Sequence, residues 1–352
     1  MRILWIGRFS SNGGGGDAIF DQKIIANLSS QHNLERLELK PNRSRIGRLL
    51  RAISGFKTLE RAAYSTRENR RLIKLALRDE PDVVVISHEA LDWAANISLN
   101  YRTVIVVHNV TSSYGHELVP VKSLGLLYRG IAFLYERSLY RHRENRYLVA
   151  ISSSDRRILE SISGRNDIGL AWPGMPQVVR LKAHASIHPS LIIAGTFDWI
   201  LKRRDLNRFA KEYLSTKAAL SPTFIEPVPE HIRSCIPDAV FGSRDNSESV
   251  GFGLITDRFR AGFKLKVGAY IASNLIPIAF ADVADDYIGL PHAEEFIITV
   301  DTVGEIDDLM GRIISMQTPD TLVRFGEFQA AAAERFSWER SAAAIASFFP
   351  DR

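Results

Sequence analysis

Cysteine is almost absent from this chain, because Cys235 is the only thiol among its 352 residues. A single thiol excludes an internal disulfide and any metal site built from several thiolates. The His-Glu-x-x-His and Asp-x-Asp patterns that often mark zinc or magnesium sites are missing as well. We therefore expect no bound metal and no cofactor.

Long apolar runs are also missing. The longest, residues 118–135, is interrupted by Lys122 and Arg129, so it is not expected to span a bilayer. The opening residues 1–7 form an apolar run that is too short for a secretory signal peptide and fits a first β-strand. We expect a cytoplasmic protein.

Acidic residues are absent from one segment, 41–59. Its cations are Arg43, Arg45, Arg48, Arg51 and Lys57. Apolar residues recur between them at helical spacing, which predicts a helix with one apolar and one cationic side. Such a helix fits the surface of an anionic membrane. The alternative is a solvated helix face or a loop.

Positive charge is concentrated in the first half of the chain. Residues 1–172 carry 26 Lys and Arg against 17 Asp and Glu, whereas residues 173–352 carry 19 against 23. This asymmetry indicates that the first half contacts something anionic, such as a membrane or a phosphorylated substrate. Nucleic acid is not expected, because no nucleic-acid-binding motif accompanies the charge.

Short β-branched runs alternate with longer amphipathic segments along the whole chain. In the first half the amphipathic segments predict helices at about 17–30, 62–79, 90–98, 123–146 and 153–163. Strands are predicted at 3–6, 34–39, 83–86, 104–107, 147–151, 168–171, 190–194, 223–225, 239–241, 253–255, 275–280 and 295–300. Continuous apolar strands separated by helices predict parallel sheets covered on both faces. The segment 172–176, with two prolines and a glycine, predicts a domain boundary. We expect an α/β protein with two doubly wound Rossmann-like domains, 1–172 and 173–352, facing each other across a cleft.

The first predicted strand is followed by a glycine-rich turn that contains Gly14 and Gly15. Consecutive glycines allow the backbone to approach a ligand closely and to aim amide groups at an anion. The turn is therefore a candidate ligand-binding loop. The alternative is a flexible connection in which Asp17 caps the next helix.

Two histidines directly follow predicted strands. His108 comes after strand 103–107, and His88 follows 83–86 in the sequence Ser87-His88-Glu89. The carboxyl end of a parallel strand is a typical position for a histidine that acts as a general acid or positions a substrate. The alternative for each is a structural histidine.

Two glycine turns in the second half lead into helices that carry cations near their starts. A cation is unfavourable at a helix N-terminus, so Lys264 is better explained if an anion binds there. We expect the two turns to hold a diphosphate. The residues concerned are Gly195, Thr196, Lys202, Gly262, Phe263 and Lys264.

Taken in order, these motifs resemble the retaining GT-B glycosyltransferases of the group 1 family. The resemblance covers most of the chain. It rests on the opening strand and glycine loop, His-Asn-Val at 108–110, the segments 150–155, 195–199 and 262–279, and Phe-Ser-Trp at 336–338. The last helix of such proteins can pack back on the first domain.

The resemblance implies a glycosyltransferase, retaining and metal-independent, that acts in the synthesis of surface polysaccharide or glycoconjugates. A nucleotide-diphosphate sugar is the implied donor, and a saccharide or lipid-linked saccharide is the implied acceptor. His108 is the implied catalytic residue. Gly14 and Gly15 join the six residues of the two turns as donor-binding residues. Arg45, Arg48 and Arg51 are expected to contact the acceptor or the inner membrane surface, where the protein is peripheral.

One departure from the family leaves other functions open. The family has a Glu-x7-Glu pair, and Ala261 and Ala269 stand at those two positions. Asp257 or Glu248 could replace the missing carboxylates. The alternatives are a catalytically inactive GT-B subunit that binds a sugar or a partner enzyme, and a nucleotide-sugar epimerase or phosphorylase on the same fold.

Overall fold

The computed structural model describes residues 1–9, 15–42, 44–55, 57–119, 121–182, 185–216, 221–225, 228–236, 239–242 and 249–350. The chain forms two compact units. Unit 1 comprises Met1–Pro173, Ala261–Phe263 and Trp338–Arg352, and unit 2 comprises Gly174–Arg260 and Lys264–Ser337. The main division lies one residue from the boundary that the sequence predicts.

The sheet of unit 1 has six parallel strands in the order β2-β1-β3-β4-β5-β6. These strands are β1 (Arg2–Gly7), β2 (Asn33–Glu38), β3 (Val83–Ser87), β4 (Arg102–Val107), β5 (Arg146–Ala150) and β6 (Gly169–Leu170). Because β1 pairs with both β2 and β3, the strand order reverses at β1. Ligands of open α/β sheets bind beyond the carboxyl ends of the strands at such a switch point.

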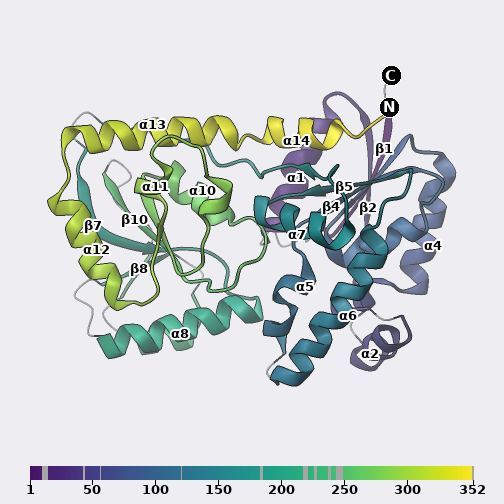
Figure 1. Ribbon diagram of the computed structural model, residues 1–352, viewed down its shortest axis with the longest axis horizontal. Helices are drawn as coiled ribbons and strands as arrows, with labels where there is room; N and C mark the ends of the chain where they lie inside the picture. Colours follow the sequence, from purple (N-terminus) through teal and green to yellow (C-terminus); the bar gives the residue numbers. More distant parts are fainter. Residues whose placement is uncertain are drawn as a thin grey trace. The chain divides into compact units, whose positions relative to one another are not determined.

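Helices cover both faces of this sheet, as Figure 1 shows. They are α1 (Gly16–Ser29), α2 (Arg45–Ser54), α3 (Leu59–Tyr64), α4 (Arg67–Ala76), α5 (Thr111–Tyr114), α6 (Lys122–Tyr140), α7 (Ser153–Ser163) and α14 (Trp338–Ala346), with short 3-10 turns η1 (Leu77–Asp79), η2 (Glu89–Asn96) and η3 (Gly115–Leu118). Along β1, Ile3 and Trp5 face the core under α1 and α14, whereas Leu4 and Ile6 face the opposite core. Both faces of the sheet are therefore buried, which explains the continuous apolar strands.

Helix boundaries in unit 1 differ from the sequence expectation at three places. The helix expected over 62–79 is broken at Ser65, and Thr66 starts α4 by accepting a hydrogen bond from the Asn69 amide. The helix expected to run to 146 ends at Tyr140, because Arg146 begins β5. The segment 90–98 forms the 3-10 turn η2.

The sheet of unit 2 is also parallel and has six strands, in the order β12-β11-β10-β7-β8-β9. Its strands are β7 (Ile187–Ile193), β8 (Thr223–Ile225), β9 (Val240–Gly242), β10 (Val250–Ile255), β11 (Leu275–Ala279) and β12 (Ile298–Thr299). Its helices are α8 (Ile200–Thr216), α9 (Glu230–Cys235), α10 (Leu265–Ala272), η4 (Ala284–Asp286), α11 (Ala293–Phe296), α12 (Gly304–Ser315) and α13 (Pro319–Arg335). The switch point lies between β7 and β10. The predicted α/β class with two parallel sheets is confirmed.

Tyr270 on α10 holds the two central strands of unit 2 together at this switch point. Its hydroxyl accepts a hydrogen bond from the Ala194 amide at 2.9 Å and donates to the Leu254 carbonyl at 3.1 Å. A Cβ atom on Gly253 would lie only 2.4 Å from the Tyr270 ring, so glycine is needed beneath it. The carboxyl ends of β7 and β10 are therefore fixed relative to α10.

Candidate functional site

Two buried polar residues follow β10 at the switch point of unit 2. Thr256 and Asp257 are 0% and 1% exposed, and one Asp257 oxygen lies 3.4 Å from the Lys264 ammonium. Burial raises the pKa of Asp257, but the charges of Lys264, Lys266 and Lys202 outweigh it and hold that pKa below its ordinary value. Asp257 is therefore an anion among three cations.

Lys266 is the least satisfied of these cations. Its buried ammonium has no hydrogen-bond partner within the described part of the chain, and it lies 5.0 Å from the centre of the Phe197 ring. Burial lowers the pKa of Lys266 from 10.5 to about 8, with Asp257 opposing that shift. A buried ammonium without an acceptor is costly unless a ligand supplies one.

Gly195 makes room for this ammonium. It follows β7 with a φ of 128°, a conformation that favours glycine, and a Cβ atom there would lie 2.7 Å from the Lys266 Nζ. Thr196 is half-buried in the same turn, and Lys202 lies in the first turn of α8. Three lysines against one carboxylate leave an excess of positive charge, which suits a multiply charged anion.

The remaining predicted donor-binding residues do not belong to unit 2. Gly14 lies outside the described residues, and Gly15 is the N-cap of α1 in unit 1. Gly262 and Phe263 also belong to unit 1. Asp17 lies in the first turn of α1 and is not its N-cap, contrary to the alternative interpretation of the glycine loop.

The Gly262 turn is already engaged. Its amide donates to the Asp155 carboxylate at 3.1 Å, whose other oxygen accepts from the Val110 amide at 3.1 Å. Phe263 packs against the apolar core of unit 1. These two residues therefore hold the segment 261–263 in place, and their role in donor binding stays a prediction.

The two alanines at the family's carboxylate positions have different surroundings. Ala261 is buried in unit 1 and directly precedes Gly262, whose amide donates to the Asp155 carboxylate, and Ala269 is half-buried on α10 of unit 2. Asp257, one of the suggested replacements, is buried and lies 3.4 Å from Lys264. Glu248, the other, lies outside the described residues.

His108 lies at the carboxyl end of β4, one strand from the switch point of unit 1. It is 3% exposed, and its Nε2 atom lies 2.9 Å from the Ser87 hydroxyl. That hydroxyl donates to the Asp21 carboxylate at 2.5 Å. Burial lowers the pKa of His108 to about 4, so its imidazole is neutral near pH 7.

A second polar cluster surrounds His88. The Arg8 guanidinium lies 2.9 Å from the Glu60 carboxylate and 2.8 Å from His88 Nε2, and Glu89 accepts from the Asn109 amide side chain at 3.1 Å. His88 has a φ of 92°, which is rare for a residue with a Cβ atom. Strain of this kind often marks functional positions. This cluster lies beyond β1 and β3.

The cationic segment 41–59 contains the helix α2, and it exposes apolar side chains. Ile46, Leu49 and Leu50 are 73%, 53% and 62% exposed. Arg48 is half-buried, whereas Arg51 turns inward and donates from Nε to the Ala62 carbonyl at 2.9 Å. The expected surface role therefore does not fit Arg51. The side chain of Arg45 lies outside the described residues.

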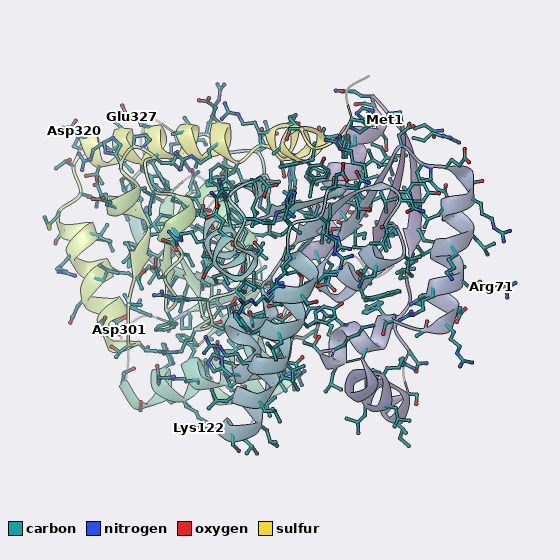
Figure 2. All side chains as sticks on the ribbon, turned by 45° about the vertical axis from the view of Figure 1, so that its right-hand side comes forward. Met1, Arg71, Lys122, Asp301, Asp320 and Glu327 are labelled. Carbon is teal, nitrogen blue, oxygen red and sulfur yellow. The ribbon has the colours of Figure 1, made fainter. Side chains whose placement is uncertain are left out.

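Helix α6 adds a second exposed apolar surface. Its exposed leucines are Leu124, Leu126, Leu127 and Leu134. Both α2 and the Lys122 end of α6 reach the lower edge of unit 1 in Figures 1 and 2. Among the described helices, none is both long enough and apolar enough to cross a bilayer.

Sequence reasoning missed three charged residues that lie near the switch points of the two sheets. Lys266, Asp21 and Arg8 were not among the expected site residues, although each lies at a switch point. A lysine in the first turn of a mostly buried helix and an aspartate within a helix carry no recognisable spacing signal. The sequence did show that Lys264 and Lys266 stand at the start of a predicted helix that is otherwise mostly apolar.

No protein-family model matches this chain, and no curated protein matches its sequence. Solved structures do resemble it. Trehalose-6-phosphate synthase OtsA aligns over 99% of this chain and 98% of its own, with a TM-score of 0.64 and 11% identity. WaaG, a glycosyltransferase involved in lipopolysaccharide biosynthesis, aligns over 100% of both chains, with a TM-score of 0.61 and 12% identity. HepE from Anabaena, solved with UDP and glucose, aligns over 99% of this chain and 98% of its own, with a TM-score of 0.62 and 12% identity. The chain therefore has the GT-B fold of these glycosyltransferases.

Proposed function

We propose that this protein is a glycosyltransferase that moves a sugar from a nucleotide-diphosphate donor to a saccharide or lipid-linked saccharide acceptor. Unit 2 binds the donor diphosphate, and unit 1 binds the acceptor. The observation that carries the proposal is the buried Lys266 ammonium, which has no acceptor among the described residues and lies beside Gly195 at the switch point of unit 2.

The cations of unit 2 supply what this reaction needs. When the bond between sugar and diphosphate breaks, negative charge develops on the departing diphosphate. Preorganised cations in a site with little water stabilise that charge without reorganisation. Lys266 and Lys264 provide such cations, Lys202 adds to the local positive charge, and Asp257 lowers the net charge of the cluster.

The structural neighbours support a nucleotide-sugar donor. One trehalose-6-phosphate protein of E. coli was solved with UDP-2-fluoro glucose bound, and HepE was solved with UDP and glucose. WaaG is described as a glycosyltransferase involved in lipopolysaccharide biosynthesis. We propose the same broad chemistry for this chain, with surface polysaccharide or glycoconjugate as the product.

A panel of nucleotide sugars tests this proposal against its alternatives. The purified protein is incubated with each donor and with a lipid extract as acceptor, and the products are separated. A transferase releases a nucleoside diphosphate and attaches the donor sugar to a molecule of the extract. An epimerase changes the sugar and releases no diphosphate, and an inactive subunit leaves every donor intact. Either of the last two results excludes the transferase.

We further propose that transfer is retaining and independent of metal. Lysines take the place that a divalent cation occupies in metal-dependent enzymes, because they can neutralise the leaving diphosphate themselves. Activity that survives EDTA supports this view, and activity restored only by a divalent cation contradicts it. The anomeric configuration of the product, read by NMR, tests retention.

We propose that unit 1 also docks on the inner, anionic face of a cytoplasmic membrane, where a lipid-linked acceptor is found. Exposed apolar side chains on α2 and α6 enter the interface, and neighbouring cations such as Arg48 and Lys122 face the lipid headgroups. Apolar area combined with positive charge is the pattern of interfacial binding.

A further inference from the structure

Three side chains link α1 to β4 through β3 beneath the switch point of unit 1. Asp21 lies on α1, Ser87 ends β3, and His108 follows β4. The Ser87 hydroxyl lies 2.5 Å from an Asp21 carboxylate oxygen and 2.9 Å from His108 Nε2. Asp21 and Ser87 are 2% and 0% exposed, so water does not supply alternative partners.

A hydroxyl has a single proton, and this fact sets the direction of both hydrogen bonds. When Ser87 donates to the Asp21 carboxylate, its oxygen can only accept from His108. The imidazole of His108 must then carry its proton on Nε2. Because Nε2 is engaged, Nδ1 is the ring nitrogen that remains for a ligand, and it is a hydrogen-bond acceptor.

We propose that Asp21 and Ser87 are positioning residues that hold His108 in the Nε2-protonated tautomer, so that its Nδ1 accepts a hydrogen bond from a substrate hydroxyl. The opposite tautomer would present an N–H group, which suits a phosphate or carbonyl oxygen. The proposal rests on the proposed function, because it assigns His108 a sugar hydroxyl as its partner. Phe20 supports the geometry, since its ring packs edge-on against His108 at 5.0 Å.

Protonation of Asp21 reverses the direction of both hydrogen bonds, from Ser87 to Asp21 and from His108 to Ser87. A neutral carboxyl group can donate to Ser87, whose hydroxyl proton then turns toward His108 Nε2. Burial raises the pKa of Asp21 to about 7, which places this reversal near neutral pH. Asp21 is faced by Trp5 and Ser87, and by the charged groups Arg8 and Asp17; His108 is faced by Asp17, Arg8 and His88.

Nitrogen-15 NMR of the histidine rings in the full chain tests the tautomer directly, with His108→Gln used to assign the signal. At pH 8 the wild type is expected to show the proton on Nε2. Asp21→Leu frees the Ser87 hydroxyl and shifts the proton to Nδ1. Asp21→Asn keeps an acceptor for Ser87, so it retains the Nε2 proton and loses the pH dependence near 7. A wild-type proton on Nδ1 at pH 8 overturns the proposal.

Kinetics then separate positioning from a structural role. Ser87→Ala and Asp21→Leu should lower kcat/KM for the donor about tenfold or more, and Asp21→Asn should restore most of it at pH 8. Nucleoside diphosphate affinity should not change, because that site lies in unit 2. Unchanged kcat/KM in Ser87→Ala overturns the proposal. A wild type that cleaves no nucleotide sugar contradicts the proposed function instead, and the tautomer measurement remains valid.

Discussion

The side chain of Lys266 fills the space that a Cβ atom on Gly195 would occupy, with the Lys266 Cε atom 2.2 Å from that position. Gly195→Ala should therefore displace the ammonium and also strain a backbone with a φ of 128°. We expect nucleoside diphosphate binding to fall at least about tenfold, measured by calorimetry.

A matched glycine provides the control. Gly311 lies within α12 of the same unit, and a Cβ atom there meets nothing within 4 Å. Gly311→Ala should leave binding unchanged and stabilise the helix slightly, by up to about 1 kcal/mol. Equal loss of binding in both variants would mean that the Gly195 effect is not local.

Diphosphate binding should depend on the protonation of Lys266. Because burial lowers its pKa to about 8, the free protein loses this charge as the pH rises above 8. Affinity should therefore be highest below pH 8 and decline above it. At pH 8 binding should take up about half a proton, and more at higher pH, which calorimetry in buffers of different ionisation enthalpy measures. In Lys266→Met the proton uptake should disappear.

The lowered pKa of Lys266 also predicts an effect on the stability of the fold. Since the folded pKa of Lys266 lies below its unfolded value of 10.5, its ionised form disfavours folding, and this cost is fully present below pH 8. Lys266→Met should raise the free energy of unfolding by on the order of 3 kcal/mol at pH 7. The gain should shrink between pH 8 and 10.5. Urea unfolding at several pH values provides the measurement, and a destabilised variant would assign Lys266 a structural role.

Membrane docking should depend on Arg48 and on salt. Liposomes with anionic lipid are expected to co-sediment with the protein, and Arg48→Glu should weaken binding roughly fivefold or more. Added salt should weaken it too, since the Debye length falls from about 10 Å at 0.1 M to about 3 Å at 1 M. Arg71→Glu is the control, because Arg71 lies on α4 at another side of unit 1 (Figure 2).

Two results would contradict this account of α2. Equal binding to neutral liposomes would exclude the electrostatic contribution, and no binding to any liposome would exclude docking. Arg51→Glu is unsuitable for the test, because it removes the bond between Arg51 and the Ala62 carbonyl. We expect that variant to lower the melting temperature.

The two sheets were predictable because their central strands are apolar runs bounded by helical patterns or turns, as in Val83–Ser87. The site was less predictable, because its polar contacts join residues that are distant in sequence. Lys266 meets Gly195 only when α10 packs beside β7, and Asp21 meets Ser87 across 66 positions. The sequence did indicate His108, because the carboxyl end of a strand is a local feature. It could not show that Gly262 is engaged by Asp155.

The central claim is that unit 2 binds a nucleoside diphosphate through Lys266, and titration calorimetry with UDP and GDP tests it most directly. The wild type should bind at least one of them. Lys266→Met should lose a charge-assisted contact worth about 1.5 to 3 kcal/mol, which weakens binding ten- to hundredfold. Lys211→Ala, an exposed lysine on α8, should bind like the wild type. Equal affinity in Lys266→Met, or no binding by the wild type, would contradict the account.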